Sequence, residues 1–257
     1  MKFPLDPKPT FAESLLFWIT RYVRYKLTSL SNRQVKDPDA LFAIINELSN
    51  GVNSIEELQQ LAKRARNCGL IGINTYFKPL QKLYLHLTKL PLRSLKEIDE
   101  ETIIDFLATA TANLSDATKK NYRITMINFF KYIEKNNETD GQIHVFGIEL
   151  KNWAGLRGKA GVKLPVHLSE DEIQRFIKAI DEYPFRSDVA ARNRAIIKLI
   201  LYTGIRVSEA INLKLKDFMP QEDVYLINIV GKGNKSRVVM IKKHHIKRDL
   251  DEWLLMR

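Results

Sequence analysis

The sequence predicts a mainly α protein with a small β-sheet, arranged as two domains. Apolar residues recur at three- and four-residue spacing from about residue 10 to 136, as on the buried face of helices. The period changes to two in VYLINIV, residues 224–230, and in SRVVMI, residues 236–241. Between about 137 and 168, glycines, polar residues and Pro165 interrupt both patterns and indicate an inter-domain connection. We place the domains at 1–155 and 165–257, joined by a linker at about 156–164.

Helices of the first domain are expected over residues 11–30, 37–49, 54–67, 75–89, 99–112 and 115–136. Two of them begin with capping residues, namely Ser54 with Glu57 three positions later, and Ser115 or Asp116. The last helix has an apolar face that should be buried, formed by Tyr122, Met126, Phe129, Phe130 and Ile133.

The second domain should open with a helix at LSEDEIQRFIKAI, where Ser169 and Glu172 have the spacing of a capping box. A helix over 188–203 should end at Gly204, and another should begin at about Arg206 or Val207 and continue through VSEAINL. The two strands form a hairpin around GKGNK, and a helix is expected in KRDLDEWLLM, which ends at residue 256.

The positive charge is concentrated in the second part of the chain. The net charge is +11, and residues 151–257 carry 21 of the 41 basic side chains but 13 of the 30 acidic ones. Residues 224–248 hold seven basic side chains and no carboxylate, a pattern that attracts polyanions such as nucleic acid. Charge alone leaves a merely solvated surface open as the alternative.

Several other classes are disfavoured. No signal peptide or apolar run long enough for a membrane span is visible, so we expect a cytoplasmic protein without a membrane partner. Cys68 is the single cysteine, which we expect to be buried, and no Cys/His cluster has zinc-ligand spacing. GKGNKS lacks the spacing and the following helix of a phosphate-binding P-loop.

The stretch YTGIRVSEAINL, residues 202–213, places Arg206 and Glu209 in an otherwise apolar run. The pair is either a salt bridge at a helix start or a group that binds a phosphate. Lys232 at the hairpin tip is likewise either an exposed turn residue or an ammonium group within reach of a phosphate.

Taken together, these segments resemble the tyrosine recombinase family, particularly its Xer type. The resemblance is carried by TGIRVSEAINLKLKDF, INIVGKGNKSRVVMI, KLPVHLSEDEIQRFIKAI and SDATKKNYRITMINFFKYI, and it covers about residues 75–257. It implies a helical core-binding domain of the SAM-like kind, followed by the first part of a mixed α/β catalytic domain. The helical region before residue 70 is similar to the longer N-terminal region of single-recombinase Xer systems.

The resemblance also implies roles for individual residues. Arg206 would bind the non-bridging oxygens of the scissile phosphate, Glu209 would orient Arg206, and Lys232 would protonate the departing 5′ oxygen. Basic side chains expected to contact DNA are Lys78, Lys119, Lys120, Arg123, Lys235 and Arg237.

Other parts of the family pattern are missing from these 257 residues. The family has a His-x-x-Arg motif and a tyrosine nucleophile well after the hairpin, whereas no tyrosine follows Tyr225. His245 and Arg248 match His-x-x-Arg literally but come only 13 residues after Lys232, and we interpret them as a basic surface segment. We therefore expect a fragment of a longer recombinase that binds DNA without cleaving it.

By resemblance, the parent enzyme would cleave and rejoin DNA through a 3′-phosphotyrosyl intermediate, without metal or nucleotide cofactor. It would clamp duplex DNA and assemble as a homo-tetramer on two recombination sites. Its role would be chromosome dimer resolution at a dif-type site, with a septal DNA translocase as the partner that the resemblance implies. A phage or transposon integrase, and a non-catalytic DNA-binding regulator, are the alternatives.

Overall fold

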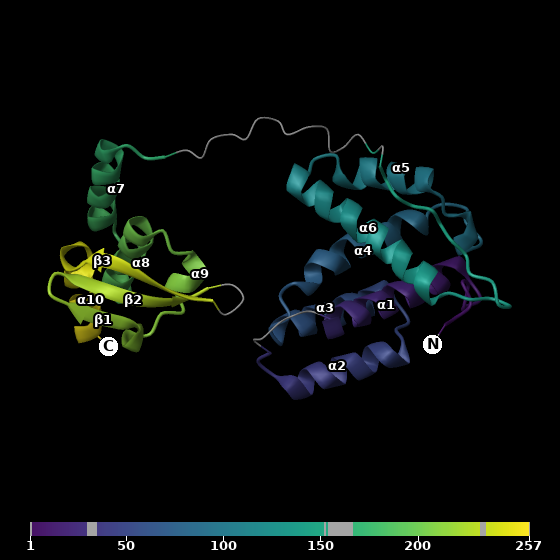
Figure 1. The fold of residues 1–257 in the computed structure, drawn as a ribbon, viewed down its shortest axis with the longest axis horizontal. Coiled ribbons are helices and arrows are strands. Elements are labelled where there is room, and N and C mark those ends of the chain that lie inside the picture. The colour runs from purple at the N-terminus through teal and green to yellow at the C-terminus, as the bar shows by residue number, and fades with distance from the viewer. Residues whose placement is uncertain (1, 30–34, 152, 154–166, 232–234, 257) are drawn as a thin grey trace. The chain divides into compact units, whose positions relative to one another are not determined.

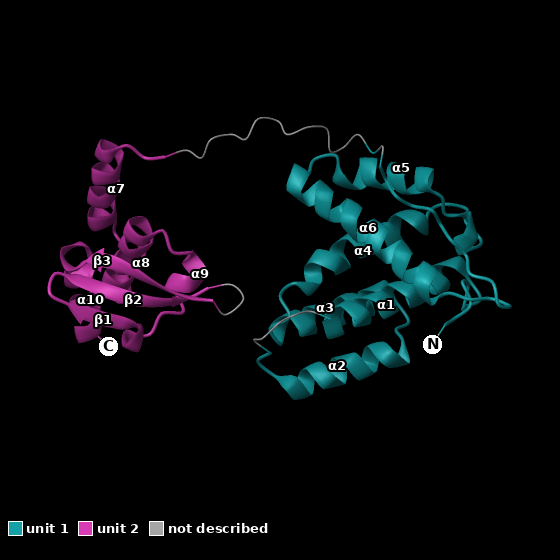
Figure 2. Ribbon diagram, viewed as in Figure 1, with its two compact units in different colours: residues 1–162 teal, residues 163–257 magenta. Residues whose placement is uncertain are grey.

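We describe the protein from a computed structural model, for residues 2–29, 35–151, 153, 167–231 and 235–256. The chain divides into two compact units, residues 1–162 and 163–257, which are described separately (Figure 2). The described part of the fold is mainly helical with a small sheet, as predicted, although the sheet has three strands where two were expected. Among the described helices, none has the length and apolar character needed to cross a lipid bilayer.

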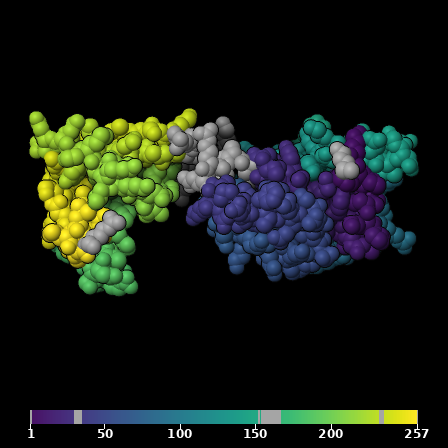
Figure 3. All heavy atoms as spheres, turned by 90° about the horizontal axis from the view of Figure 1, so that it is seen from below, coloured from purple at the N-terminus to yellow at the C-terminus, as the bar shows by residue number. Residues whose placement is uncertain are grey.

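Unit 1 is helical in its described part (Figure 1). Its helices are α1 (Phe11–Ser29), α2 (Pro38–Asn50), α3 (Ile55–Asn67), α4 (Ile73–Leu87), the 3-10 helix η1 (Leu95–Glu97), α5 (Glu100–Thr111) and α6 (Asp116–Asn136). On the face of unit 1 that Figure 3 turns toward the viewer, the N-terminal part of the chain, coloured purple to blue, forms the surface. α2 has a buried side in Ile44 and Leu48, whereas Phe42 on the same helix is 66% exposed.

Side-chain caps determine where these helices begin. Ser54 accepts a hydrogen bond from the backbone N–H of Glu57, and Ser115 accepts one from Thr118, as the capping signals predicted. Asp37 caps α2 ahead of Pro38, and proline is well tolerated at the first helical position because that N–H has no helical partner. Asp99 caps α5 through the N–H of Thr102.

The core of unit 1 is rich in aromatic side chains contributed by α1 and α6. Trp18, Tyr22 and Phe129 are fully buried, and the rings of Tyr22 and Phe129 meet edge to face with centroids 5.4 Å apart. The indole N–H of Trp18 donates to the carbonyl of Leu5 at 2.7 Å, so the polar atom of this buried ring is satisfied. The predicted apolar face of residues 115–136 is buried along its length, and Cys68 is buried too.

Residues 137–151 differ from the expectation of an inter-domain connection. They form neither a helix nor an extended strand, yet they fold back on unit 1, where Ile148 and Leu150 are buried. Leu150 has a left-handed φ of 52°, a conformation that costs a non-glycine residue about 1–2 kcal/mol. Two hydrogen bonds hold it there: its N–H donates to Glu100 at 3.2 Å, and its carbonyl accepts from Arg123 at 2.9 Å.

Unit 2 combines helices with the small sheet. Its elements are α7 (Glu170–Glu182), α8 (Ala190–Thr203), α9 (Val207–Ala210), the 3-10 helix η3 (Leu215–Asp217), β1 (Phe218–Gln221), β2 (Val224–Val230), β3 (Ser236–Lys242) and α10 (Lys243–Leu255). α7 begins with the predicted capping box, in which Ser169 and Glu172 each bond the other's backbone N–H. α8 ends at Gly204, as predicted, with this glycine in the left-handed region at φ 64°.

The sheet is antiparallel in the order β1-β2-β3. One face carries Ile227, Ile229 and Ile241, which pack with Leu199 of α8 and Ile246 of α10 to form the core of unit 2. The β2–β3 register pairs Ile229 with Arg237 and Val230 with Ser236. Because directly paired residues share a face of the sheet, Arg237 is on the core-facing side.

Two predicted helices of unit 2 have other bounds. The helix after Arg206 is short, since α9 ends at Ala210 instead of continuing through the following Ile-Asn-Leu. α10 starts at Lys243, several residues earlier than expected, so the HHIKR segment belongs to the helix instead of leading into it, while His244, Lys247 and Arg248 are exposed. Ile246 is buried within it and fixes this first turn against the sheet.

Candidate catalytic and DNA-binding site

The position of Arg206 follows from the way α8 ends. Gly204 takes the left-handed conformation and donates its N–H to the carbonyl of Ile200 at 2.9 Å, which terminates the helix. The next side chain, Ile205, is 2% exposed and anchors the chain in the core of unit 2. Arg206 follows in an extended conformation, and its side chain is 69% exposed. The turn therefore fixes the backbone of Arg206 while the guanidinium faces solvent.

Glu209 lies on α9, three residues after Arg206, and accepts hydrogen bonds from both the backbone and the side chain of Arg206. Its Oε2 accepts the backbone N–H of Arg206 at 2.8 Å, and its Oε1 accepts from Nη1 of Arg206 at 3.0 Å. The carboxylate side chain is only 5% exposed. The remaining side-chain donors of Arg206 have no partner among the described residues, so they are free to bind an anion such as a phosphate.

Arg237 completes this cluster from β3. Its Nη2 donates to Oε2 of Glu209 at 2.7 Å and its Nη1 to Oε1 at 3.1 Å, a bidentate pair across 28 positions of sequence. Hydrogen bonding from Arg237, and next from the backbone N–H of Arg206, lowers the pKa of Glu209 to about 2. The cluster thus has two guanidinium groups on one buried carboxylate.

The base of the β2–β3 hairpin lies next to α9, the helix that carries this carboxylate (Figure 1). Gly231 donates its N–H to the carbonyl of Lys235 at 2.9 Å, and Lys235 is exposed. A Cβ added at Gly231 would be 3.1 Å from both Nη1 of Arg237 and Oε1 of Glu209. Lys232 lies outside the described residues.

His245 and Arg248, which match His-x-x-Arg literally, differ in their surroundings, since His245 is half-buried and Arg248 is exposed. The ring of His245 stacks on that of Tyr202 with centroids 3.7 Å apart, and burial together with the charges of His244 and Lys242 lowers the pKa of His245. Arg248 is exposed on α10. Tyr225 packs in the sheet with its ring 6.0 Å from that of Phe218. These side chains do not join the cluster around Glu209.

The DNA-binding candidates of unit 1 fall into two groups. Lys78 on α4 and Lys120 on α6 are exposed, and Lys119 is half-buried. A hydrogen bond of 3.0 Å from Asn121 to the carbonyl of Thr75 joins the beginnings of these two helices. Arg123 is engaged instead with the carbonyls of Leu150 and Glu149, at 2.9 and 3.4 Å.

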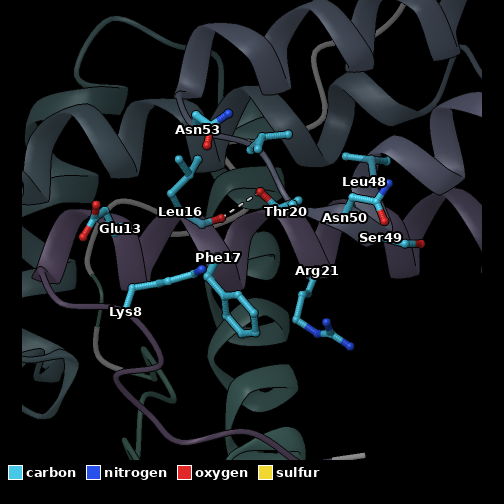
Figure 4. A pocket seen from close by; sticks show the side chains of 12 residues that line it. Lys8, Glu13, Leu16, Phe17, Thr20, Arg21, Leu48, Ser49, Asn50 and Asn53 are labelled. Atoms are coloured by element: carbon cyan, nitrogen blue, oxygen red, sulfur yellow. Dashed lines mark hydrogen bonds between the residues drawn. The ribbon is translucent and has the colours of Figure 1, made fainter.

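The described parts of the two units also contain hollows on their surfaces. One in unit 1 has a volume of about 420 Å³ and is lined by Lys8 ahead of α1, by residues of α1 such as Glu13, by the end of α2, and by the loop after it, which includes Asn53 (Figure 4). The hydroxyl of Thr20 there already donates to the carbonyl of Leu16 at 2.8 Å. Within the described ranges, no group of histidine, cysteine and carboxylate side chains is arranged to hold a metal ion.

Comparison with protein families accounts for both units. Residues 6–137 match the phage integrase SAM-like domain, and residues 167–257 match the phage integrase family. A helical domain of this kind followed by a mixed α/β domain defines an enzyme class that acts on DNA. The chain belongs to the tyrosine recombinase family, also called the phage integrase family.

Named relatives and solved structures narrow the similarity to the Xer type. Tyrosine recombinase XerH of Campylobacter jejuni is 53% identical over 246 residues, which cover 96% of this chain and 69% of that protein. XerH of Helicobacter pylori is 45% identical, over 100% of this chain and 73% of that protein. A crystal structure of XerH bound to a palindromic difH substrate, in a post-cleavage complex, has a TM-score of 0.91 and 46% identity, and covers 100% of this chain and 72% of that one.

Proposed function

We propose that this protein is a site-specific DNA recombinase that acts at a dif-type site. The observation that carries the proposal is the exposed guanidinium of Arg206, held at its base by the buried carboxylate of Glu209. A phosphodiester in the transition state gains negative charge on its non-bridging oxygens, and a fixed guanidinium can bind two such oxygens at once. The similarity to XerH proteins, which have been solved with difH DNA in pre-cleavage and post-cleavage complexes, supports the choice of substrate.

The reaction proceeds by exchange of one phosphodiester for another. A tyrosine oxygen attacks the phosphorus, a 3′-phosphotyrosyl bond forms, and the bond to the 5′ oxygen breaks. Arg206 stabilises the charge on the phosphate, and Lys232 delivers a proton to the departing 5′ oxygen. Attack by the 5′ hydroxyl of another strand reverses these steps and releases the tyrosine. The energy of the phosphodiester is retained, so no nucleotide needs to be hydrolysed.

We do not expect the nucleophile among the tyrosines of unit 2, because their rings are engaged in other contacts. Tyr225 packs on Phe218, Tyr202 stacks on His245, and Tyr183 lies against Phe185 with ring centroids 4.5 Å apart. Among the described residues, the side-chain hydrogen bond of Arg206 goes to Glu209 and not to one of these tyrosines. We expect these 257 residues to bind duplex DNA and to leave it uncut, with the exposed lysines Lys78, Lys120 and Lys235 contributing phosphate contacts.

The cellular part of the proposal is that two recombination sites are held by a homo-tetramer during resolution of chromosome dimers. A septal DNA translocase would be the partner that activates the reaction. Support for this part comes from the 53% and 45% identity to XerH proteins.

The test uses the protein expressed from its complete gene and a duplex with a nick near the candidate cleavage position of a dif-type site. The nick lets the short piece that carries the new 5′ hydroxyl diffuse away, so religation is prevented and the covalent protein–DNA adduct accumulates and survives denaturing gel electrophoresis. The same duplex with scrambled sequence is the control for specificity. A parallel binding experiment with residues 1–257 measures the affinity for the same two duplexes as a function of salt concentration.

An adduct that forms on the dif-type duplex and disappears when one tyrosine is changed to phenylalanine is the expected result. Salt-dependent binding without an adduct would overturn the enzymatic proposal and favour a protein that only binds DNA. An adduct of equal yield on both duplexes would overturn the assignment of a dif-type site while keeping the chemistry.

A further inference from the structure

Arg237 is a charged residue on the core-facing side of the sheet. In the strand register it lies opposite the buried Ile229 of β2. Val239 and Ile241 follow it on β3 at two-residue spacing and lie on the same face of the sheet. An ion pair stabilises the part of the guanidinium that lies against the apolar core, because a desolvated charge without a partner is costly. Its side chain is 41% exposed, so one part of it faces solvent while the fork faces Glu209.

The carboxylate of Glu209 is saturated by the two arginines. Oε1 accepts from Nη1 of Arg206 and Nη1 of Arg237, at 3.0 and 3.1 Å, and Oε2 accepts from the backbone N–H of Arg206 and Nη2 of Arg237, at 2.8 and 2.7 Å. A carboxylate has about four acceptor positions, and all of them are used here. Without Arg237, the two hydrogen bonds left to Glu209 would both come from Arg206. Glu209, which orients Arg206, would then no longer be held by β3.

The hairpin backbone is part of the same contact. Gly231 closes the base of the hairpin through its hydrogen bond to Lys235. If Gly231 had a Cβ, this atom would lie 3.1 Å from both Arg237 and Glu209, so the backbone passes close to the two side chains. Arg237 therefore links three elements: β3, on which it lies, α9, which carries Glu209, and the end of β2 at the hairpin base. The short separations leave little freedom for these elements to shift independently.

We propose that Arg237 is a positioning residue, which fixes the carboxylate of Glu209 so that Arg206 and the hairpin base keep one geometry at the phosphate. The inference rests on the recombinase function proposed above. It differs from the role suggested by the sequence, in which Arg237 contacts DNA directly. Misplacement of a catalytic group by about 1 Å can lower a rate by about 100-fold, so a positioning role is measurable in the cleavage rate.

The experiment measures the single-turnover rate of adduct formation at saturating nicked DNA, and separately the affinity and its salt dependence, for protein from the complete gene. The variants are Arg237→Gln, Arg237→Lys, Glu209→Gln and the double variant Arg237→Gln/Glu209→Gln. Arg186→Gln is the matched control, since Arg186 makes another bidentate pair in unit 2, with Asp188 at 2.6 and 2.7 Å, between α7 and α8. Circular dichroism verifies that each variant is folded.

We expect Arg237→Gln to lower the rate by about 10- to 100-fold while its affinity and salt slope stay close to those of the unchanged protein. The double variant should be no slower than the slower single variant, because Arg237 acts through Glu209. Arg237→Lys should recover part of the rate, since one ammonium donor can still reach the carboxylate, and it tests the proposal even if Arg237→Gln is unstable. Arg186→Gln should cleave at the unchanged rate.

Other outcomes separate the two proposals. If Arg237 contacted a phosphate directly, Arg237→Gln would weaken DNA binding and reduce the salt slope by about 1. The losses of rate caused by Arg237→Gln and Glu209→Gln would then multiply in the double variant. This result would overturn the positioning role. An unchanged rate for Arg237→Gln would overturn it as well, while the recombinase function would stand. If the unchanged protein forms no adduct, the recombinase function itself fails.

Discussion

Asp249 of α10 accepts a hydrogen bond of 2.7 Å from the guanidinium of Arg194 on α8, and its carboxylate is 3% exposed. The other carboxylate oxygen accepts from Lys198 at 2.7 Å, also on α8. Lys198 in turn bonds Asp181 of α7. One buried carboxylate thus joins the three longest helices of unit 2, on which the short sheet and α9 depend.

Asp249→Asn should destabilise unit 2 by about 1–3 kcal/mol, because the two largely buried cations would keep only their more exposed partners, Glu252 and Asp181. The measurement is amide hydrogen exchange in α8 and α10 of the whole chain, which reports the free energy of local opening. The matched control is Asp251→Asn on the same helix, whose pair with Lys247 is exposed, and which should cost no more than about 0.5 kcal/mol. Equal protection in both variants would contradict the structural role of the buried network.

Glu209 should make the stability of unit 2 depend on acid pH. Its pKa in the folded protein is lowered from 4.5 to about 2, so its ion pairs contribute fully above pH 4.5 and are lost as the pH falls toward 2. A urea titration followed by the NMR signals of β2 and β3 should show a stability difference between the unchanged protein and Glu209→Gln that is large at pH 5.5 and shrinks as the pH is lowered through this range. A difference that stays constant with pH would argue against the ionised pair.

Arg206→Ala should reduce adduct formation by about 100-fold or more at saturating DNA, as loss of one charge-stabilising donor does in other enzymes. Affinity for DNA should fall only modestly, with a salt slope lower by about 1. Arg248→Gln serves as control, because Arg248 is exposed on α10 and is not part of the cluster around Glu209. If Arg248→Gln were the variant that lost cleavage, the literal His-x-x-Arg match would have to be taken as functional.

Lys232→Ala should leave DNA affinity nearly unchanged and slow cleavage, because a general acid acts on the leaving group and contributes little to binding. A substrate with a 5′ leaving group that needs no proton should restore the rate of the variant. The comparison is the ratio of rates on the two substrates, for the unchanged protein and for Lys232→Ala. A ratio that is the same for both proteins would remove Lys232 from the role of proton donor.

The helices of unit 1 could be predicted from the sequence because their signals are local. Ser54 and Ser115 cap within three residues of their own position, and Tyr122 to Ile133 repeat an apolar face that only a helix can bury. The same is true of Ser169, Gly204 and the period-two strands of unit 2.

The contacts that build the site are long-range and were only partly predictable. The pair of Arg206 with Glu209 follows from their three-residue spacing, whereas Arg237 reaches Glu209 from 28 positions away. A signal did exist, since the alternation that packs Val239 and Ile241 against the core also places Arg237 on the same face. Arg123 could not be placed, because its carbonyl partners lie in residues 149–150, which have no helical or strand pattern.

The early part of α10 was missed for a related reason. Lys243, His244 and His245 read as polar surface residues, but Ile246 is buried and the ring of His245 stacks on Tyr202. Tertiary contact with the sheet and α8 therefore extends the helix beyond what composition suggests.

The return of residues 137–151 onto the helices bears on how unit 1 can be prepared by itself. A piece cut at the end of α6 would retain every helix and still lose Ile148 and Leu150 from the interior, together with the bonds that Glu100 and Arg123 make to this segment. Phe130 would also lose the ring of Phe146, whose centroid is 4.9 Å away. The natural cutting point for recombinant expression of unit 1 is therefore after Trp153, which also packs against this core, and not where the last helix stops.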